Sequence, residues 1–576
     1  NMVVMNARGV LVSCDLSGTT STKYSGILLH NTWILTTGSI LNCLIHNNSN
    51  LNIESPWKNL LKSVVPGSLV RIHNTFLQNT PISFSALCPA VTSPNQGTSR
   101  LDTLTTINKS LMKFIPKYQS SKELWDNNKK LSSSISSLAS HSPETHTEYK
   151  CDLKYIWKSP LVIEAVDSLL SSWTLGSTSG GNDDADIDAE SEIAKHLLPM
   201  FLIFKLNSNK YDGCEKAELN DVVQVLQELF EQDEDILKRG RMTVVESTPF
   251  GNSLFYNSLT EGIISNVVGP GNCLILTDAR TALGCEGGPI FVLAERDKKS
   301  KVYLIGMVVC SLSWWRGEWV GFTLGVALKA AVHHCIHETT PSYSISSLKP
   351  SSKYIDKLGT MGQNLVLVRC GVGWGSGIVI DADKGVILTC SHVVRKAHNN
   401  PITIYWKDMK KPAKLLFRSK DGIAYDVAIL HVEPGMHFQS ASFSSRIPKK
   451  GEPVIAAGFP LFSEDNIRPT VTRGIVAHVS NPAAMLQTTC CVQSGASGGA
   501  VFWSTGELMG LISCNTQDVA SGALYPNINM AVPICMLETH LHNYIKTGDI
   551  KFLNNLESPD PAIQRLWKLQ SLNNKL

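Results

Sequence analysis

Three residues in the last third of the chain have the side chains that nucleophilic catalysis requires. Ser497 lies in a loop of small residues between glycines, where a hydroxyl can be approached closely and backbone N–H groups stay uncovered. His392 follows the apolar run 386–389, and Asp426 opens the apolar run 427–430. A serine nucleophile, a histidine base and an orienting carboxylate together can carry out acyl transfer.

Each of these residues also has an ordinary interpretation as a turn or strand-end residue. Their combination is harder to obtain by chance, and the order His392, Asp426, Ser497 fits a two-barrel protease with its site between the barrels. Ser497 would then attack a carbonyl, His392 would transfer the proton, and Asp426 would orient the imidazole. The N–H groups of Gly495 and Ser497 would form the oxyanion hole.

Composition narrows the class of protein. A chain of 576 residues needs several hydrophobic cores. The net charge of +3 gives no electrostatic argument for a nucleic-acid partner, and no apolar run reaches the roughly 18 residues of a membrane span. The N-terminal residues do not resemble a secretory signal. Fifteen cysteines without a regular CxxC array predict buried thiols in a reducing compartment, with no metal site and no cofactor.

Short apolar runs at regular spacing predict an all-β fold of barrels or sandwiches. The chain also repeats itself, in the same order and in three blocks: 26–39 resembles 377–392, 262–267 resembles 474–479, and 284–291 resembles 495–502. We therefore expect two copies of one module, the first of them enlarged by insertions.

The first copy lacks the chemistry of the second. Ser39 stands where the second copy has His392, and Glu286 stands where it has Ser497. No counterpart of Asp426 is evident near 197–206. The first copy is therefore predicted to be a degenerate, pseudoprotease region with a structural or regulatory role.

The expected domain organisation follows from these copies and from composition. It comprises a degenerate region 1–337 with low-complexity insertions near 95–150 and 176–192, a linker 338–354, an active domain 355–548 and a C-terminal tail 549–576. A short amphipathic helix is expected over 221–237.

A family resemblance becomes visible over about 360–540. Residues 374–380, 385–394, 425–430 and 506–510 resemble the trypsin-like serine proteases of the HtrA/Deg branch. A degenerate copy upstream of an intact one is similar to the peroxisomal (glyoxysomal) processing proteases. This resemblance implies tandem chymotrypsin/trypsin-like double β-barrel modules and a serine endopeptidase. It also implies substrates with peroxisomal targeting leaders, β-oxidation enzymes among them, and autocatalytic cleavage.

The C-terminus and the residues near Ser497 lead to expectations about location, partners and specificity. The final Asn574-Lys575-Leu576 is close to a peroxisomal address, so we expect an import receptor as a partner and the peroxisomal matrix as the location. Self-association is a further expectation.

Cys490, Cys491 and the strand around 513–514 are expected near the S1 pocket, and the absence of an acid there favours a small P1 residue. The alternatives are a general Deg-type quality-control protease and a catalytically inactive scaffold.

Overall fold

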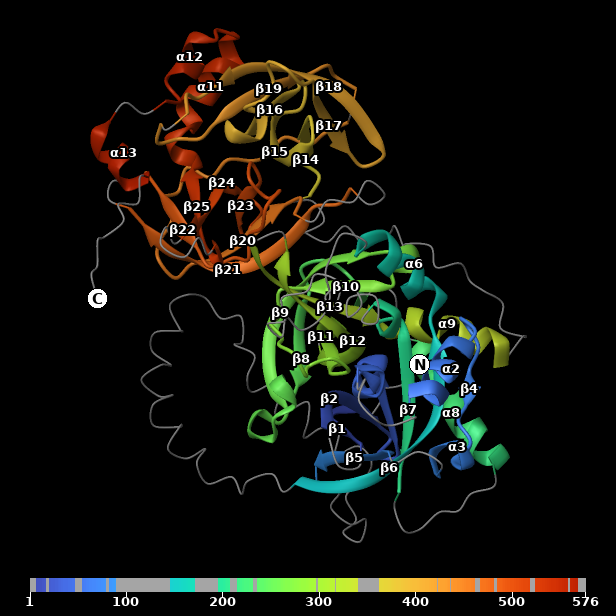
Figure 1. Cartoon of the computed structure of the whole chain (residues 1–576). Helices are drawn as coiled ribbons and strands as arrows, with labels where there is room; N and C mark the ends of the chain where they lie inside the picture. Colours follow the sequence, from blue (N-terminus) through green and yellow to red (C-terminus); the bar gives the residue numbers. More distant parts are fainter. Residues whose placement is uncertain are drawn as a thin grey trace, which may run out of the picture.

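The chain forms two halves, one above the other in Figure 1. The computed structural model describes residues 7–567 with gaps at 17–19, 47–53, 79–81, 90–145, 171–194, 208–214, 232–235, 297–298, 316–317, 340–361, 422, 436, 461–466, 481–483, 518–523 and 558–559. Residues up to Thr339 make the lower half and residues from 362 make the upper half.

The first half contains two rings of antiparallel strands. In the first ring the order is β6-β5-β1-β2-β3-β7, β7 pairs back onto β6, and β4 lies beside β6. Its strands are β1 (Ala7–Leu16), β2 (Thr20–Leu29), β3 (Trp33–Thr37), β4 (Val70–Arg71), β5 (Ile82–Pro89), β6 (His146–Lys158) and β7 (Met200–Leu206). The second ring is a closed barrel of β8 (Met242–Ser247), β9 (Ser258–Val268), β10 (Leu274–Thr277), β11 (Pro289–Arg296), β12 (Lys299–Trp315) and β13 (Glu318–Ala327).

The second half repeats this plan in two closed barrels. One is built from β14 (Leu365–Cys370), β15 (Gly373–Asp381), β16 (Val386–Thr389), β17 (Ile402–Trp406), β18 (Met409–Arg418) and β19 (Ala428–Val432). The other is built from β20 (Pro453–Gly458), β21 (Thr470–Val479), β22 (Leu486–Thr488), β23 (Ala500–Trp503), β24 (Leu508–Gln517) and β25 (Leu524–Pro533). The expected all-β fold of tandem double-barrel modules is confirmed.

Helices lie outside the barrels. In the first half they are α1 (Cys43–His46), α2 (Glu54–Ser63), α3 (Asn74–Gln78), α6 (Pro160–Leu169), α8 (Glu215–Phe230) and α9 (Leu328–Thr339). The second half has α11 (Glu538–Thr547), α12 (Lys551–Asn554) and α13 (Pro561–Trp567). Among the described helices, none combines the length and apolar character needed to cross a membrane.

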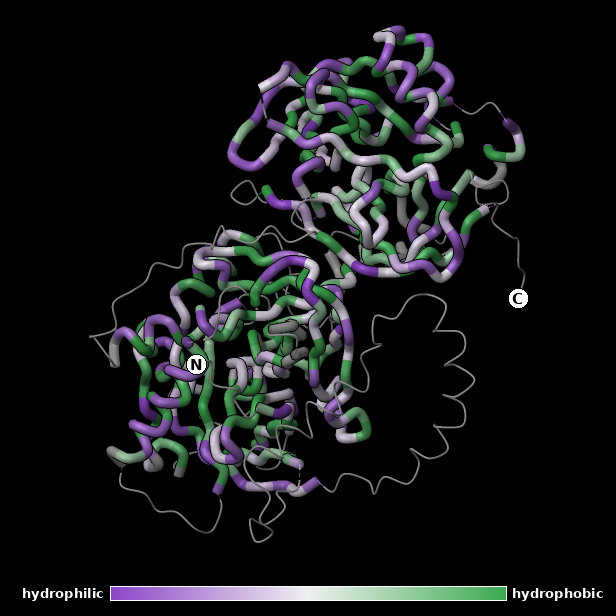
Figure 2. The backbone as a smooth tube through the Cα atoms, turned by 180° about the vertical axis from the view of Figure 1, so that it is seen from behind, coloured by the Kyte–Doolittle hydropathy of each residue, from purple (hydrophilic) through white to green (hydrophobic). Residues whose placement is uncertain are grey.

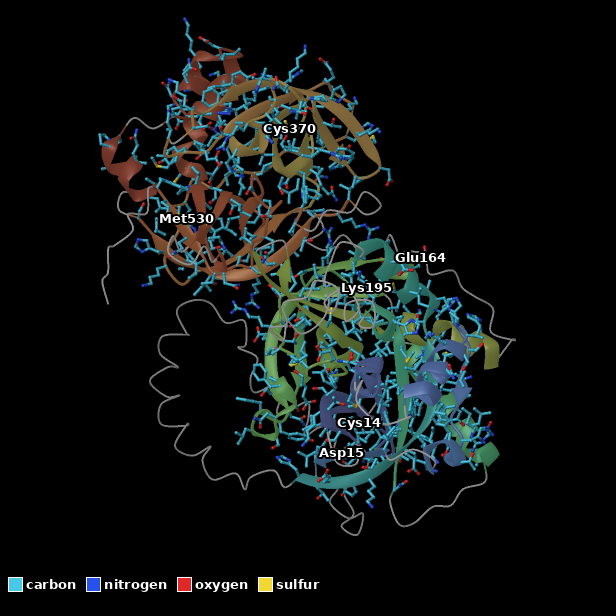
Figure 3. All side chains as sticks on the ribbon, viewed as in Figure 1. Cys14, Asp15, Glu164, Lys195, Cys370 and Met530 are labelled. Carbon is cyan, nitrogen blue, oxygen red and sulfur yellow. The ribbon has the colours of Figure 1, made fainter. Side chains whose placement is uncertain are left out.

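Buried apolar side chains hold each barrel closed. The strands of the barrels carry most of the hydrophobic stretches in Figure 2, and polar stretches gather on the outer loops and helices. This distribution follows from the short apolar runs, since strands such as β16 and β23 are buried along their whole length. Figure 3 places Cys14 and Cys370 in corresponding barrels of the two halves.

Several boundaries differ from the sequence-based expectation. The helix expected over 221–237 is α8, which begins at Glu215 and ends at Phe230. Strand β6 begins at His146, so 146–150 belong to a barrel and not to an insertion. The rest of that insertion, the insertion 176–192, residues 340–354 of the linker and the C-terminal tripeptide lie outside the described residues.

Part of the expected tail packs on the second half. The side chains of Leu553, Leu556 and Ile563 are buried in its core. The indole N–H of Trp567 donates to the carbonyl of Ala484 at 3.2 Å. The segment from α12 to α13 therefore belongs to the folded module, because a detached tail would leave these apolar side chains in water.

Candidate active site

His392 and Asp426 meet because two neighbouring strands end together. Strand β16 pairs with β19 in a register that sets Thr389 opposite Ala428, so the residues just beyond these ends lie side by side. The Asp426 carboxylate accepts hydrogen bonds from the backbone N–H of His392, at 2.9 Å, and from its Nδ1 atom. Two bonds from one carboxylate fix both the loop and the ring, which leaves Nε2 available to receive a proton.

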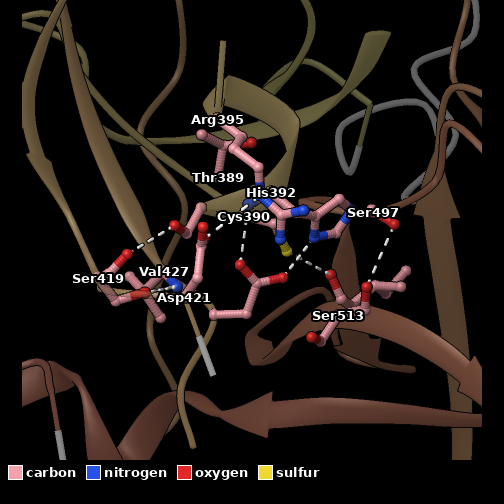
Figure 4. A network of polar contacts seen from close by, with 12 residues as sticks. Thr389, Cys390, His392, Arg395, Ser419, Asp421, Val427, Ser497 and Ser513 are labelled. Carbon is pink, nitrogen blue, oxygen red and sulfur yellow. Dashed lines mark hydrogen bonds and ion pairs between the residues drawn. The ribbon is translucent and has the colours of Figure 1, made fainter. Parts of the chain in front are cut away.

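Ser497 reaches the same place from the other barrel of the second half. It lies in the loop between β22 and β23, and Figure 4 shows it beside His392 and Ser513. Its hydroxyl donates to the backbone carbonyl of Ser513 at 3.2 Å, so its proton is not directed at His392 in this structure. A hydrogen bond from a catalytic serine to its histidine commonly forms only when substrate is bound.

The backbone around Ser497 forms an anion-binding corner. Gly495 has φ of +93° and Gly498 has φ of +83°, a region that favours glycine. A Cβ atom on Gly498 would lie 2.1 Å from the carbonyl oxygen of Ser376. Among the described residues, no hydrogen bond engages the N–H groups of Gly495 and Ser497. Two unengaged amides beside a serine hydroxyl can hold an oxyanion that develops there.

Ser376 connects this loop to both barrels, a role that sequence reasoning missed. Its buried hydroxyl donates to the carbonyl of Gly495 at 2.8 Å and accepts from the N–H of Phe459 at 2.9 Å. Its backbone N–H donates to the carbonyl of Ser497 at 2.8 Å. The internal repeat could have revealed this role, because a serine precedes the matched glycines Gly26 and Gly377 in both copies, at Ser25 and Ser376.

The first copy keeps this framework. The hydroxyl of Ser25 donates to the carbonyl of Gly284 at 2.8 Å and accepts from the N–H of Thr248 at 2.9 Å. Gly287 has φ of +88°, close to the value of Gly498. The loop geometry is therefore common to both copies, whatever residue stands at the nucleophile position.

The first copy lacks the side chains that are expected to be catalytic in the second copy. Ser39 lies in a short turn after β3, the place that His392 occupies after β16. Thr36 and Thr389 are equivalent, because each donates its hydroxyl to the carbonyl of the corresponding serine, Ser25 or Ser376. Thr36 lies opposite Leu202. In the second copy Asp426 lies two residues before Ala428, the partner of Thr389. In the first copy the residue two positions before Leu202 is Met200, whose buried thioether cannot orient a base.

Glu286 fills the anion-binding corner of the first copy. Its carboxylate accepts a hydrogen bond from the N–H of Gly284 at 2.7 Å, the group equivalent to the Gly495 amide. Burial raises the pKa of Glu286 to about 7, against the lowering effect of the backbone N–H groups of Glu286 and Gly284. The first copy therefore presents neither a nucleophile nor an open anion site.

One group of possible metal ligands overlaps the site. One ligand atom each of Cys390, His392 and Asp426 lies within 4.8 Å of the other two, and Figure 4 shows Cys390 beside the imidazole. A thiolate, an imidazole and a carboxylate are the donors that Zn²⁺ takes. The buried Cys390 thiol donates to the carbonyl of Ile512 at 3.1 Å, and His392 and Asp426 bind each other. In this structure all three side chains are therefore engaged in hydrogen bonds.

The cysteines are largely buried thiols. None of the thirteen described cysteines forms a disulfide, as predicted. Cys490 and Cys491, which were expected near the S1 pocket, are both buried. Cys490 packs within the last barrel, and Cys491 belongs to the apolar core of the first half. Their place relative to an S1 pocket stays a prediction.

Comparisons with known proteins show which proteins this chain is similar to. The family model of the trypsin-like peptidase domain matches residues 375–511. The peroxisomal leader peptide-processing protease of Homo sapiens is 32% identical over 362 residues, which is 58% of this chain and 60% of the relative. Its counterpart in Mus musculus is 31% identical over 414 residues, 68% of this chain and 69% of the relative. The aligned part of this chain therefore spans less than two thirds of the human protein.

The Deg branch also appears among the relatives. The periplasmic pH-dependent serine endoprotease DegQ of Escherichia coli is 32% identical over 187 residues, 31% of this chain and 39% of the relative.

Proposed function

Because the chain belongs to the family of the peroxisomal leader peptide-processing proteases, trypsin-like serine endopeptidases, we propose that it removes targeting leaders from peroxisomal proteins. The observation that supports this proposal is the convergence of Ser497, the His392–Asp426 pair and two unengaged amides at one loop. These groups are what hydrolysis of a peptide bond requires.

Each residue has a defined role in this proposal. His392 Nε2 accepts the proton of Ser497 as the hydroxyl oxygen attacks the scissile carbonyl carbon. Asp426 stays ionised, holds the Nδ1 proton and stabilises the imidazolium. The amides of Gly495 and Ser497 donate to the carbonyl oxygen as it becomes negative. His392 then protonates the leaving amine, and a water molecule releases the acyl group by the same steps in reverse order.

Substrates and location follow the relatives. We expect the chain to act in the peroxisomal matrix on leader-bearing enzymes, fatty-acid β-oxidation enzymes among them, and to cleave itself. A general quality-control protease would instead digest unfolded chains broadly. The cleavage pattern separates these two activities.

A single incubation tests the proposal. The purified chain and its Ser497→Ala variant are mixed with a leader-bearing peroxisomal enzyme, and the N-terminus of the product is sequenced. We expect one defined cut with the wild type and none with the variant. An unchanged substrate with both proteins, or processing by Ser497→Ala, would contradict the proposal.

A further inference from the structure

The two halves touch through their second barrels. Strand β9 of the first half lies against β21 of the second, and β13 lies against β25. Part of the contact is apolar. Ile263 of β9 packs in the apolar core of the second half, and Cys491 packs in the apolar core of the first half. One buried residue of each half therefore packs in the apolar core of the other.

Polar contacts fix the register of this interface. The side-chain amide of Asn266 donates to Thr470 Oγ1 at 3.2 Å and to the carbonyl of Arg468 at 3.4 Å. The guanidinium of Arg239 donates to the carbonyl of Pro469. Glu261 and Arg473 form an ion pair with 3.6 Å between Oε1 and Nη1. The residues at the start of β21 are thus held by side chains of the degenerate half.

Asp278 makes the most directed of these contacts. Its Oδ1 atom accepts from the N–H of Ile263 at 2.7 Å within the first half. Its Oδ2 atom accepts from the N–H of Arg473 at 2.9 Å in the second half. A part-buried carboxylate that accepts two backbone N–H groups forms stronger bonds than a neutral acceptor would.

The second copy shows what Asp278 adds. Thr489 occupies the equivalent position, since its Oγ1 accepts from the N–H of Ile475 at 3.0 Å as Asp278 accepts from that of Ile263. A threonine supplies one acceptor oxygen for its own module. The second oxygen of Asp278 has no counterpart in Thr489, and it is the one that reaches across the interface.

The strand that Asp278 holds also supports the loop before Ser497. Thr472, next to Arg473, donates its hydroxyl to the carbonyl of Cys491 at 2.8 Å. Asn529 of β25 donates to the carbonyl of Cys490 at 2.7 Å. Both strands that contact the first half therefore bind the backbone of residues 490–491, which leads directly to the Gly495–Ser497 corner.

We propose that the degenerate half positions the active site of the intact half, and that Asp278 is the positioning residue. The proposal rests on the proposed function, and it identifies the partner of the β21/β25 face as the chain's own pseudoprotease half. The contact acts through Arg473, Thr472 and the backbone of Cys491 on the amides of the oxyanion corner. Asp278 itself touches no reacting atom.

Two substitutions separate this role from folding. Asp278→Thr reproduces the Thr489 arrangement, so it keeps the bond within the first half and removes only the bond to Arg473. Asp278→Asn keeps the size of the side chain, but its NH₂ group then faces the N–H of Ile263 or of Arg473 and cannot accept a hydrogen bond from it. The matched control is Glu246→Gln, because Glu246 accepts the N–H of Gly9 at 2.7 Å in a contact between barrels of the first half.

The measurement is the turnover of the full chain per active site. A fluorophosphonate titrates reactive Ser497 in each preparation, and kcat and KM are then determined with a leader peptide. We expect kcat per titrated site to fall by at least about tenfold in both Asp278 variants, since loss of a whole oxyanion donor costs about 10²–10³. Glu246→Gln should keep the wild-type kcat per site.

The readout distinguishes positioning from stability, because a merely structural role lowers the number of titrated sites and leaves kcat per site unchanged. Wild-type kcat per site in Asp278→Thr and Asp278→Asn would overturn the inference while the proposed function stands. A wild-type chain that the fluorophosphonate does not label at Ser497 would remove both.

Discussion

The Glu286 carboxylate binds the Gly284 amide at 2.7 Å, at the position where the intact copy leaves the Gly495 amide unengaged. The side chain that stands where the second copy has Ser497 thus supplies the acceptor oxygen for this amide. The first copy retains the corner as a structural element. It differs from the second copy at all three proposed catalytic positions, because Ser39, Met200 and Glu286 stand where the second copy has His392, Asp426 and Ser497.

The buried Glu286 makes stability depend on pH. Its pKa rises from 4.5 to about 7 on folding, so the folded chain holds a proton that the unfolded chain has lost. The free energy of unfolding therefore falls as the pH rises through this window, by about 3 kcal/mol for this group. Glu286→Gln should weaken the fall between pH 5 and pH 8 in denaturant titrations. An equally steep fall in the variant would contradict this account.

The serine pair gives a matched test of the loop framework. Ser376→Ala and Ser25→Ala each leave a backbone N–H and a carbonyl without their partner, which costs about 1–3 kcal/mol. We expect similar losses of stability in thermal denaturation. Only Ser376→Ala should also lower kcat, because Ser376 holds Gly495. Equal activity of the two variants would show that the loop does not depend on this hydroxyl.

Asp426→Asn tests the orienting role of the carboxylate. An amide cannot accept both the backbone N–H and the Nδ1 proton of His392 and keep the ring in the required tautomer. We expect kcat to fall by about 10⁴, with little change in KM or in thermal stability. Peptidase assays with a leader peptide provide the measurement. Retention of more than a tenth of the activity would exclude Asp426 from the site.

Zinc provides a test of the group around Cys390. Because thiol, imidazole and carboxylate ligand atoms lie within 4.8 Å of one another, added Zn²⁺ should inhibit the peptidase by engaging His392 and Asp426. A chelator should restore activity. Cys390→Ser removes the soft ligand, so it should require about tenfold more Zn²⁺ for the same inhibition. Identical inhibition curves would place the metal elsewhere.

The local features of the site could be predicted from the sequence. Strand-forming runs, the glycine loop and the paired copies indicated barrels, and they identified Ser39 and Glu286 as replacements within a preserved frame. These features depend on residue type and spacing over a few positions, which a sequence displays directly.

The contacts between distant segments could not be predicted. Asp278 precedes an ordinary loop, and nothing in its neighbourhood reveals that one oxygen meets Arg473. Cys491 illustrates the same limit, since its burial in the other half's core depends on how two barrels dock. Helix α8 begins six residues before the expected start, because apolar periodicity marks the buried face but not the first turn.

The shared cores of the two halves change what proteolysis between them would mean. A cut in the segment joining α9 to β14 would break the peptide link between the halves. It would leave the packing of Ile263 and Cys491 and the Asp278–Arg473 hydrogen bond in place. The product would be a noncovalent heterodimer of pseudoenzyme and enzyme. It would elute as one particle in size-exclusion chromatography, and its activity would decline on dilution below its dissociation constant.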